Sequence, residues 1–236
     1  MNKLIVESKN DKIFIEALIR HLHIQAEVDT PICSIDDFEC LDGLSEKKLS
    51  VKLEELLDEV AKKGLYKIGV VIDIDEFHTT ERLNLVTNSL NQALINKNIE
   101  PIEKGFEKIN QFIRVKIDET ITVEIACFFT NLEGKGELET VLKAIKTQDS
   151  VYADCLESWR DCLEKGGRVI SQKDFDKFWL SNYIRFDTCS KKDKTQSERK
   201  CSIQNFGYVM ENKSAIFNFD SEILADLTSY LELFTK

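Results

Sequence analysis

Residues 67–77 read KIGVVIDIDEF, and this stretch decides the fold. The run 68–72 is mostly β-branched and does not alternate, which is typical of a strand buried on both faces of a parallel sheet. It ends at Asp73, Asp75 and Glu76, and α/β proteins bind ligands at the carboxyl ends of such strands. Grouped carboxylates repel one another unless a cation compensates, so the stretch predicts a divalent-metal site. A solvated acidic turn that caps the next helix is the alternative.

A second acidic strand end lies at the start of the chain. A short strand is expected over 3–6 and a helix over 11–21, with Asn10 as a helix cap and Glu7 and Asp11 in the turn. Right-handed crossovers place successive strand ends on one edge of a sheet. Glu7 and Asp73 then meet if their strands are neighbours.

The remaining pattern predicts strands and helices that build one sheet and a helical extension. The expected elements are a strand over 27–35 broken by Pro31, helices over 45–63 and 80–97, a hairpin of strands 112–117 and 120–129, a helix after the turn 131–139, an aromatic-rich helical stretch over 148–185, and a last helix capped by Ser221. We expect the aromatic side chains to form a core. The fold class is therefore α/β, with a Rossmann-like, mostly parallel sheet flanked by helices. We expect an α/β core over 1–147 and a helical C-terminal extension over 148–236, packed together as one globular unit.

Composition bounds the class of protein and its partners. The 236 residues are 42% hydrophobic and 31% charged, as in ordinary globular proteins. The longest apolar runs fall short of the ~20 residues that span a bilayer, and the N-terminal run is too short for a signal peptide, so we expect a cytoplasmic protein without membrane contact. The net charge of −10 disfavours nucleic-acid binding by the whole surface. Positive charge for nucleic acid would come from one of two sources. One is the basic stretch 191–200, which lies within a loop over 187–204 that we expect to be mobile. The other is a partner protein that brings a DNA-binding surface.

Cysteine usage favours reduced thiols over a disulfide framework or a zinc site. The seven cysteines are odd in number and form no C-x-x-C pair. They lie at positions 33, 40, 127, 155, 162, 189 and 201.

The segments LIVESKND (4–11) and VVIDIDEF (70–77), with the strand and helix alternation between them, resemble the Toprim domain of topoisomerases, bacterial primases and the nucleases named for overcoming lysogenization defect. The resemblance is strongest over residues 3–145, and it is closest to those nucleases and to small stand-alone Toprim-like proteins of undefined function. The sequence departs from the Toprim pattern in two places: Ser8 replaces a glycine, and Glu76-Phe77 replace a small pair.

The resemblance implies a set of site residues. Glu7 matches the glutamate after the first Toprim strand, and Asp73 and Asp75 match the D-x-D that binds magnesium. Asp11 and Glu139 match carboxylates that help to hold a second metal in the nucleases, with Glu137 as the rival of Glu139, although glutamates in a first helical turn are commonly dipole partners. Lys194 matches a lysine that contacts the reacting phosphate. Further candidates are Glu76, Lys9 and His78.

We therefore expect a Mg²⁺-dependent nuclease, with Mn²⁺ as a substitute, that acts on DNA or RNA in genome maintenance or anti-phage defence. Glu7 and Lys194 would be catalytic. The alternative is a Toprim-like protein that binds nucleic acid, a nucleotide or a partner without cleaving. The sequence does not decide whether the site holds one metal ion or two. It is also compatible with a homodimer.

Overall fold

The computed structural model describes residues 1–33, 44–190 and 200–235. The chain divides into two compact units. The sheet unit comprises 1–130 together with 225–236, and the helical unit comprises 131–224. The last helix of the chain thus belongs to the sheet unit.

The sheet unit is built on five strands in the order β2-β1-β3-β5-β4. Strand β3 lies in the middle and pairs in parallel with β1 and β5, and β1 pairs in parallel with β2. Strand β4 is antiparallel to β5 and forms the predicted hairpin. The predicted α/β sheet is confirmed, with strands β1 (Asn2–Val6), β2 (Glu27–Val28), β3 (Lys67–Asp73), β4 (Ile113–Lys116) and β5 (Thr122–Thr130).

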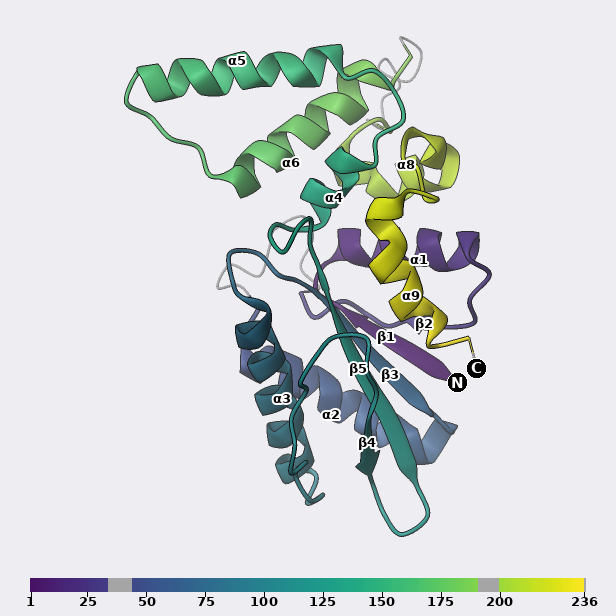
Figure 1. The fold of residues 1–236 in the computed structure, drawn as a ribbon. Coiled ribbons are helices and arrows are strands. Elements are labelled where there is room, and N and C mark those ends of the chain that lie inside the picture. The colour runs from purple at the N-terminus through teal and green to yellow at the C-terminus, as the bar shows by residue number, and fades with distance from the viewer. Residues whose placement is uncertain (34–43, 191–199, 236) are drawn as a thin grey trace. The chain divides into compact units, whose positions relative to one another are not determined.

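Helices α2 (Glu46–Lys63) and α3 (Thr79–Asn96) pack on one face of this sheet (Figure 1). Their apolar stripes bury against alternate residues of β3, from Ile68 to Ile72. Helix α2 has the predicted ends. The side chain of Ser45 accepts a hydrogen bond from the backbone N–H of Lys48, and Gly64 closes the helix at φ +64°, a conformation that glycine adopts without strain.

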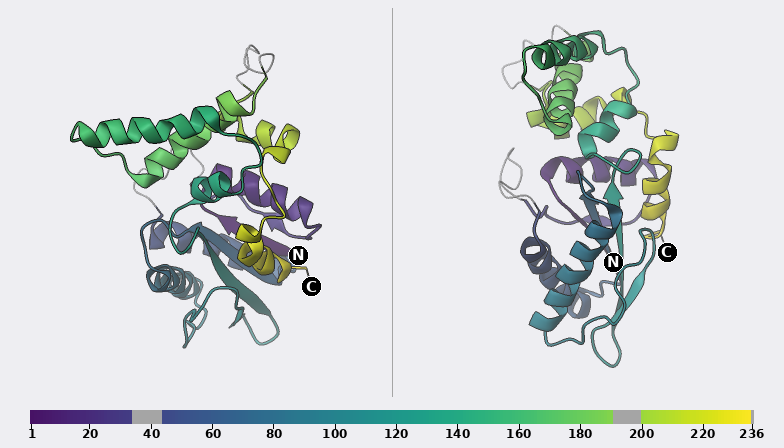
Figure 2. Two further views of the ribbon diagram at one scale, coloured as in Figure 1. Left: turned by 45° about the horizontal axis from the view of Figure 1, so that its top comes forward. Right: turned by 60° about the vertical axis from the view of Figure 1, so that its left-hand side comes forward.

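Helices α1 (Lys9–His21) and α9 (Ala225–Glu232) cover the other face (Figure 2). Helix α9 lies close to the backbone of β3. A Cβ atom added to Gly69 would come within 2.4 Å of Leu4 and 2.6 Å of the Tyr230 hydroxyl. The glycine therefore permits this approach.

The strand predicted over 27–35 is shorter in the structure. Only Glu27–Val28 pairs regularly with β1, because Pro31 has no N–H to donate. Contact with β1 resumes beyond the proline, where the backbone N–H of Ile32 donates to Val6 and that of Cys33 donates to Glu7.

The helical unit contains a hairpin of two helices, α5 and α6 (Figure 1). Phe175, Trp179 and Tyr183 are fully buried in this unit, as predicted for an aromatic core, and the rings of Trp179 and Tyr183 stack with centroids 5.2 Å apart. The elements are α4 (Leu138–Ala144), α5 (Val151–Lys165), α6 (Gln172–Asn182), the π-helical turn η1 (Tyr183–Asp187), η2 (Ile203–Asn205), α8 (Phe206–Asn212), η3 (Ser214–Ile216) and η4 (Glu222–Leu224).

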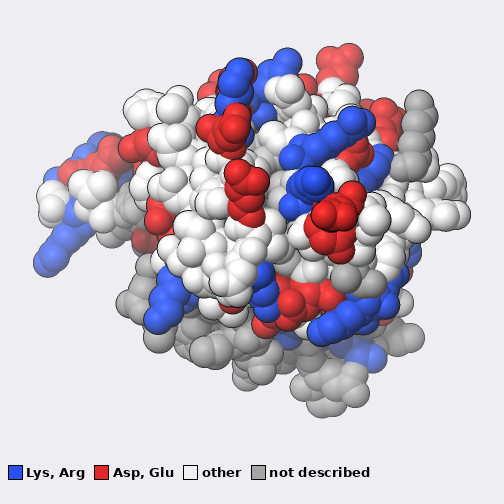
Figure 3. Space-filling model, turned by 90° about the horizontal axis from the view of Figure 1, so that it is seen from below, with Lys and Arg blue, Asp and Glu red and all other residues white. Residues whose placement is uncertain are grey.

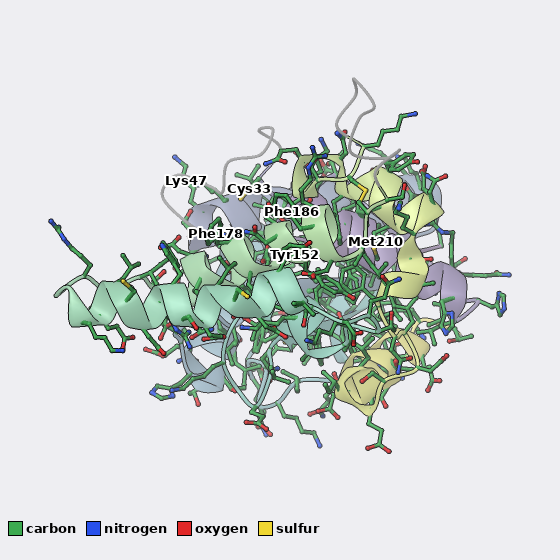
Figure 4. All side chains as sticks on the ribbon, turned by 90° about the horizontal axis from the view of Figure 1, so that it is seen from above. Cys33, Lys47, Tyr152, Phe178, Phe186 and Met210 are labelled. Carbon is green, nitrogen blue, oxygen red and sulfur yellow. A yellow bond between two sulfur atoms is a disulfide. The ribbon has the colours of Figure 1, made fainter. Side chains whose placement is uncertain are left out.

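Two other expectations about this unit are corrected. Trp159 and Phe178 are not core residues: their exposed fractions are 39% and 41%, with their rings 5.2 Å apart. Figure 4 shows Phe178 with Tyr152 and Phe186, which are also exposed. The prediction of reduced thiols is wrong for Cys189 and Cys201, which form a disulfide, because the fold brings together two residues that the sequence separates by 12 positions. It is also wrong for Cys33, which is disulfide-bonded.

Candidate functional site

The carboxyl ends of β1 and β3 bring two predicted site residues to one edge of the sheet. The register pairs Val6 of β1 with Val71 of β3. Glu7 follows Val6 and therefore lies beside Ile72, one residue before Asp73. The predicted condition, that the strands of Glu7 and Asp73 are neighbours, is confirmed.

Asp73 and Asp75 form a close carboxylate pair at the end of β3. An oxygen of one lies within 4.8 Å of an oxygen of the other. The backbone turns sharply between them, since Asp75 has φ +52°, in the left-handed region that aspartate tolerates better than most residues. The turn folds the second carboxylate back toward the first, which suits two ligands of one cation.

Arg82, in the first turns of α3, lies at this candidate site and is not predicted from the sequence. Its guanidinium is 3% exposed and forms an ion pair with Oδ2 of Asp75 at 2.5 Å. Its Nε donates to the carbonyl oxygen of Ile74, and the group lies over the ring of Phe77 at 4.3 Å. An arginine seven positions after an aspartate was the available signal, but the sequence does not show that the turn brings the two together.

Asp11 and Lys9 lie at the start of α1, whose N-cap is Ser8 and not the predicted Asn10. Oδ2 of Asp11 accepts from the backbone N–H of Ser8 at 2.8 Å, and Oγ of Ser8 accepts from the N–H of Asp11 at 3.2 Å. This capping box stabilises the helix start and begins α1 earlier than expected. Lys9 is exposed. In the described part of the chain, neither Glu7 nor Asp11 completes a group of three carboxylates with Asp73 and Asp75 within 4.8 Å.

Glu76 and His78 are exposed in the turn between β3 and α3. The backbone N–H of His78 donates to the side chain of Glu81 at 2.7 Å, which fixes the start of α3. These contacts give His78 a role in the helix cap.

Glu137 and Glu139 lie in the helical unit. Glu137 precedes α4 and forms ion pairs with Lys173 at 3.1 Å and Lys177 at 3.7 Å, both on α6. Glu139 is 9% exposed in the first turn of α4. The unit thus supplies positive charge to Glu137 from its own side chains. The predicted catalytic Lys194 lies outside the described residues.

None of the helices within the described ranges is both long and apolar enough to cross a lipid bilayer. Searches of curated proteins and of solved structures gave no match to the chain. A family match spans residues 1–236. The chain therefore belongs to the family described as protein of unknown function, DUF3226.

Proposed function

We propose that the chain is a divalent-cation-dependent enzyme that cleaves phosphodiester bonds in nucleic acid, in the manner of the Toprim nucleases that its sequence resembles. The observation that carries the proposal is the carboxylate pair of Asp73 and Asp75, with oxygens within 4.8 Å, at the end of the central strand. Glu7, at the end of the neighbouring strand, adds a third acid at this edge.

The donor set suits a hard cation. Carboxylate oxygens are the preferred protein ligands of Mg²⁺ and Mn²⁺, whereas zinc favours cysteine and histidine. Asp73, Asp75 and Glu7 would hold the ion. The Toprim resemblance implies a further carboxylate, from Glu139 or its rival Glu137. When bound, such an ion supplies positive charge to the phosphoryl oxygens and lowers the pKa of a coordinated water.

The side chains of the sheet unit have distinct tasks in this proposal. Asp73 and Asp75 bind the cation and orient it. Glu7 accepts the proton of the attacking water, as a carboxylate within reach of the reacting group can. Lys9, exposed at the first position of α1, offers a positive charge to the phosphate backbone.

The net charge of −10 favours a second candidate function, in which the site binds a nucleotide or a partner without cleavage. On the face shown in Figure 3, the acidic and basic side chains of the described residues are interspersed. A long phosphate backbone is held by a continuous basic surface, so this face suits it poorly.

Calorimetric titration with Mg²⁺ and Mn²⁺ tests the proposal. The variant is Asp73→Asn, which removes one ligand charge. Asp75→Asn is a poorer probe, because it would leave the buried guanidinium of Arg82 without its carboxylate and so disturb the fold. The matched control is Glu119→Gln, an equal charge change at an exposed residue in the hairpin turn at the opposite end of β5.

We expect the wild type and Glu119→Gln to bind the cation and Asp73→Asn to bind it at least about tenfold more weakly, since a ligand is lost. Cleavage of single- and double-stranded DNA and RNA should then require the cation and fail in Asp73→Asn. Cation binding without cleavage of any of these would favour the second candidate. If the wild type binds no cation, with or without an oligonucleotide, the acidic edge is not a metal site.

A further inference from the structure

Arg82 is the most buried cation at the acidic edge of the sheet unit among the described residues. Its three contacts all fall within one short segment, the turn from β3 to α3. The guanidinium pairs with Asp75, donates to the carbonyl oxygen of Ile74 at 3.4 Å and lies over the ring of Phe77. One side chain thus fixes three positions of the turn that carries the carboxylate pair.

The backbone conformation of Asp75 makes these contacts with Arg82 important for the direction of its carboxylate. Its backbone is in the left-handed region at φ +52°, so the direction of its side chain depends on a turn that most residues do not form. The backbone N–H of Phe77 donates to Ile74 at 3.1 Å and closes the turn. The backbone alone does not fix the rotation of the Asp75 carboxylate. The ion pair with Arg82 fixes it.

The two oxygens of a carboxylate can serve two partners at once. In metal sites, side chains that bind the outer oxygen of a ligating carboxylate orient the inner one, and losing them typically weakens metal binding about 10- to 100-fold. Arg82 engages Oδ2 of Asp75, and the Asp75 carboxylate also lies close to that of Asp73, with one oxygen of each within 4.8 Å.

We propose that Arg82 is a positioning residue of the site: it holds Asp75 in the orientation in which Asp75 and Asp73 together bind a divalent cation. The proposal rests on the proposed function. Arg82 stays on Asp75 in the cation-bound state and does not exchange with the cation. The planar fork of arginine matters, because one guanidinium serves the carboxylate and the Ile74 carbonyl together, and the single ammonium of lysine does not reproduce that geometry.

The first experiment compares Mn²⁺ affinity, by calorimetry and by electron paramagnetic resonance of the free ion, in the wild type, Arg82→Lys and Arg82→Ala. The matched control is Arg114→Lys. Arg114 pairs with Glu124 at 3.1 Å in the same unit, but its side chain is 79% exposed and lies on β4. Circular dichroism and the melting temperature of each metal-free variant report on the fold.

We expect Arg82→Lys to bind Mn²⁺ about 10- to 100-fold more weakly while folded, and Arg114→Lys to bind as the wild type does. Millimolar guanidinium should restore part of the affinity of Arg82→Ala. A purely structural Arg82 would lower the melting temperature and leave the affinity of the folded protein unchanged. Unchanged or tighter Mn²⁺ binding in folded Arg82→Lys overturns the proposal.

A measurement on the wild type keeps the proposal falsifiable if the variants do not fold. The Nε–H of Arg82 should give a protected resonance in ¹⁵N nuclear magnetic resonance spectra. The proposal expects that resonance to shift and stay protected when Mg²⁺ is added. Loss of protection would show that the cation displaces Arg82 and overturns the proposal. If the wild type binds neither Mn²⁺ nor Mg²⁺, the proposed function itself is wrong. If the wild type binds the ion and the Arg82 variants bind it equally well, only this inference is wrong.

Discussion

The hydroxyl of Tyr230 donates to the carbonyl oxygen of Ala126 at 3.1 Å. The two residues are 104 positions apart, and the bond joins the last helix, α9, to the middle of β5. The Tyr230 hydroxyl also lies 3.5 Å from the carbonyl oxygen of Val70 on β3. Burial raises the pKa of Tyr230 well above its ordinary value, so the phenol stays a neutral donor at physiological pH. The C-terminus is therefore part of the sheet unit.

Replacing this phenol should destabilise the sheet unit. Tyr230→Phe removes the donor and leaves a buried carbonyl oxygen with one bond fewer. We expect the free energy of unfolding to fall by about 1–2 kcal/mol. Urea denaturation followed by circular dichroism measures it. Tyr66→Phe, at a side chain exposed by 65%, is the control and should change little. Equal stabilities of the two variants would show that the buried hydrogen bond contributes nothing.

Gly69→Ala tests the close packing of α9 on β3. The new methyl group would lie 2.4 Å from a carbon of Leu4 and 2.7 Å from a ring carbon of Phe234, closer than real contacts allow. The buried neighbours must move, so we expect a loss of about 1–3 kcal/mol, as for other overpacked cores. Adding Phe234→Leu should recover part of the loss in a double-mutant cycle. Additive effects of the two substitutions would mean that the clash lies elsewhere.

The sequence predicted the sheet well because the signals for it are local. The β-branched run of β3 and the cap residues of α2, Ser45 and Gly64, depend on neighbours along the chain. For the candidate site, the sequence predicted only the placement that follows from strand ends, as for Glu7 and Asp73. Arg82 was missed because its partner is set by the left-handed turn at Asp75, and the Cys189–Cys201 bond was missed because its geometry arises from folding.

Low pH should destabilise the sheet unit through the ion-pair cluster around Lys3, a residue only 4% exposed. The hydrogen bond from Lys3, at 2.8 Å, lowers the pKa of Glu59 below its ordinary 4.5. Burial alone would raise the pKa of Asp29, but its bond with Lys52 lowers it below its ordinary 3.8. The unfolded chain therefore binds protons more readily, so stability rises with pH in this range. We expect it to fall as the pH drops below about 5 and through the lowered pKa values.

Lys3→Met is the variant that isolates this effect. It removes the cation that lowers the pKa of Glu59, so the free energy of unfolding should depend less steeply on pH below about 5. At neutral pH the variant should lose about 1–3 kcal/mol, since buried carboxylate oxygens lose a charged donor. Urea denaturation at a series of pH values gives both quantities. Lys63→Met, which removes a partner of Glu59 that is itself 56% exposed, is the control and should have the smaller effect. A pH profile identical to that of the wild type would contradict the assignment.

The Cys189–Cys201 disulfide should stabilise the helical unit. Cys201 is fully buried and Cys189 is 8% exposed, so the bond lies inside the unit and closes a loop of 12 residues. A loop of this length restricts the unfolded chain by about 3 kcal/mol in the chain-entropy model. We expect the double variant Cys189→Ser, Cys201→Ser to unfold at a lower urea concentration, with a loss of about 2–3 kcal/mol. A reductant should lower the stability of the wild type by more than that of the double variant. Cys127, Cys155 and Cys162 are free thiols in both proteins, and the disulfide-bonded Cys33 responds to the reductant equally in both. If the reductant leaves the wild type unchanged, or if mass spectrometry of the alkylated native protein finds both thiols free, this bond does not stabilise the unit.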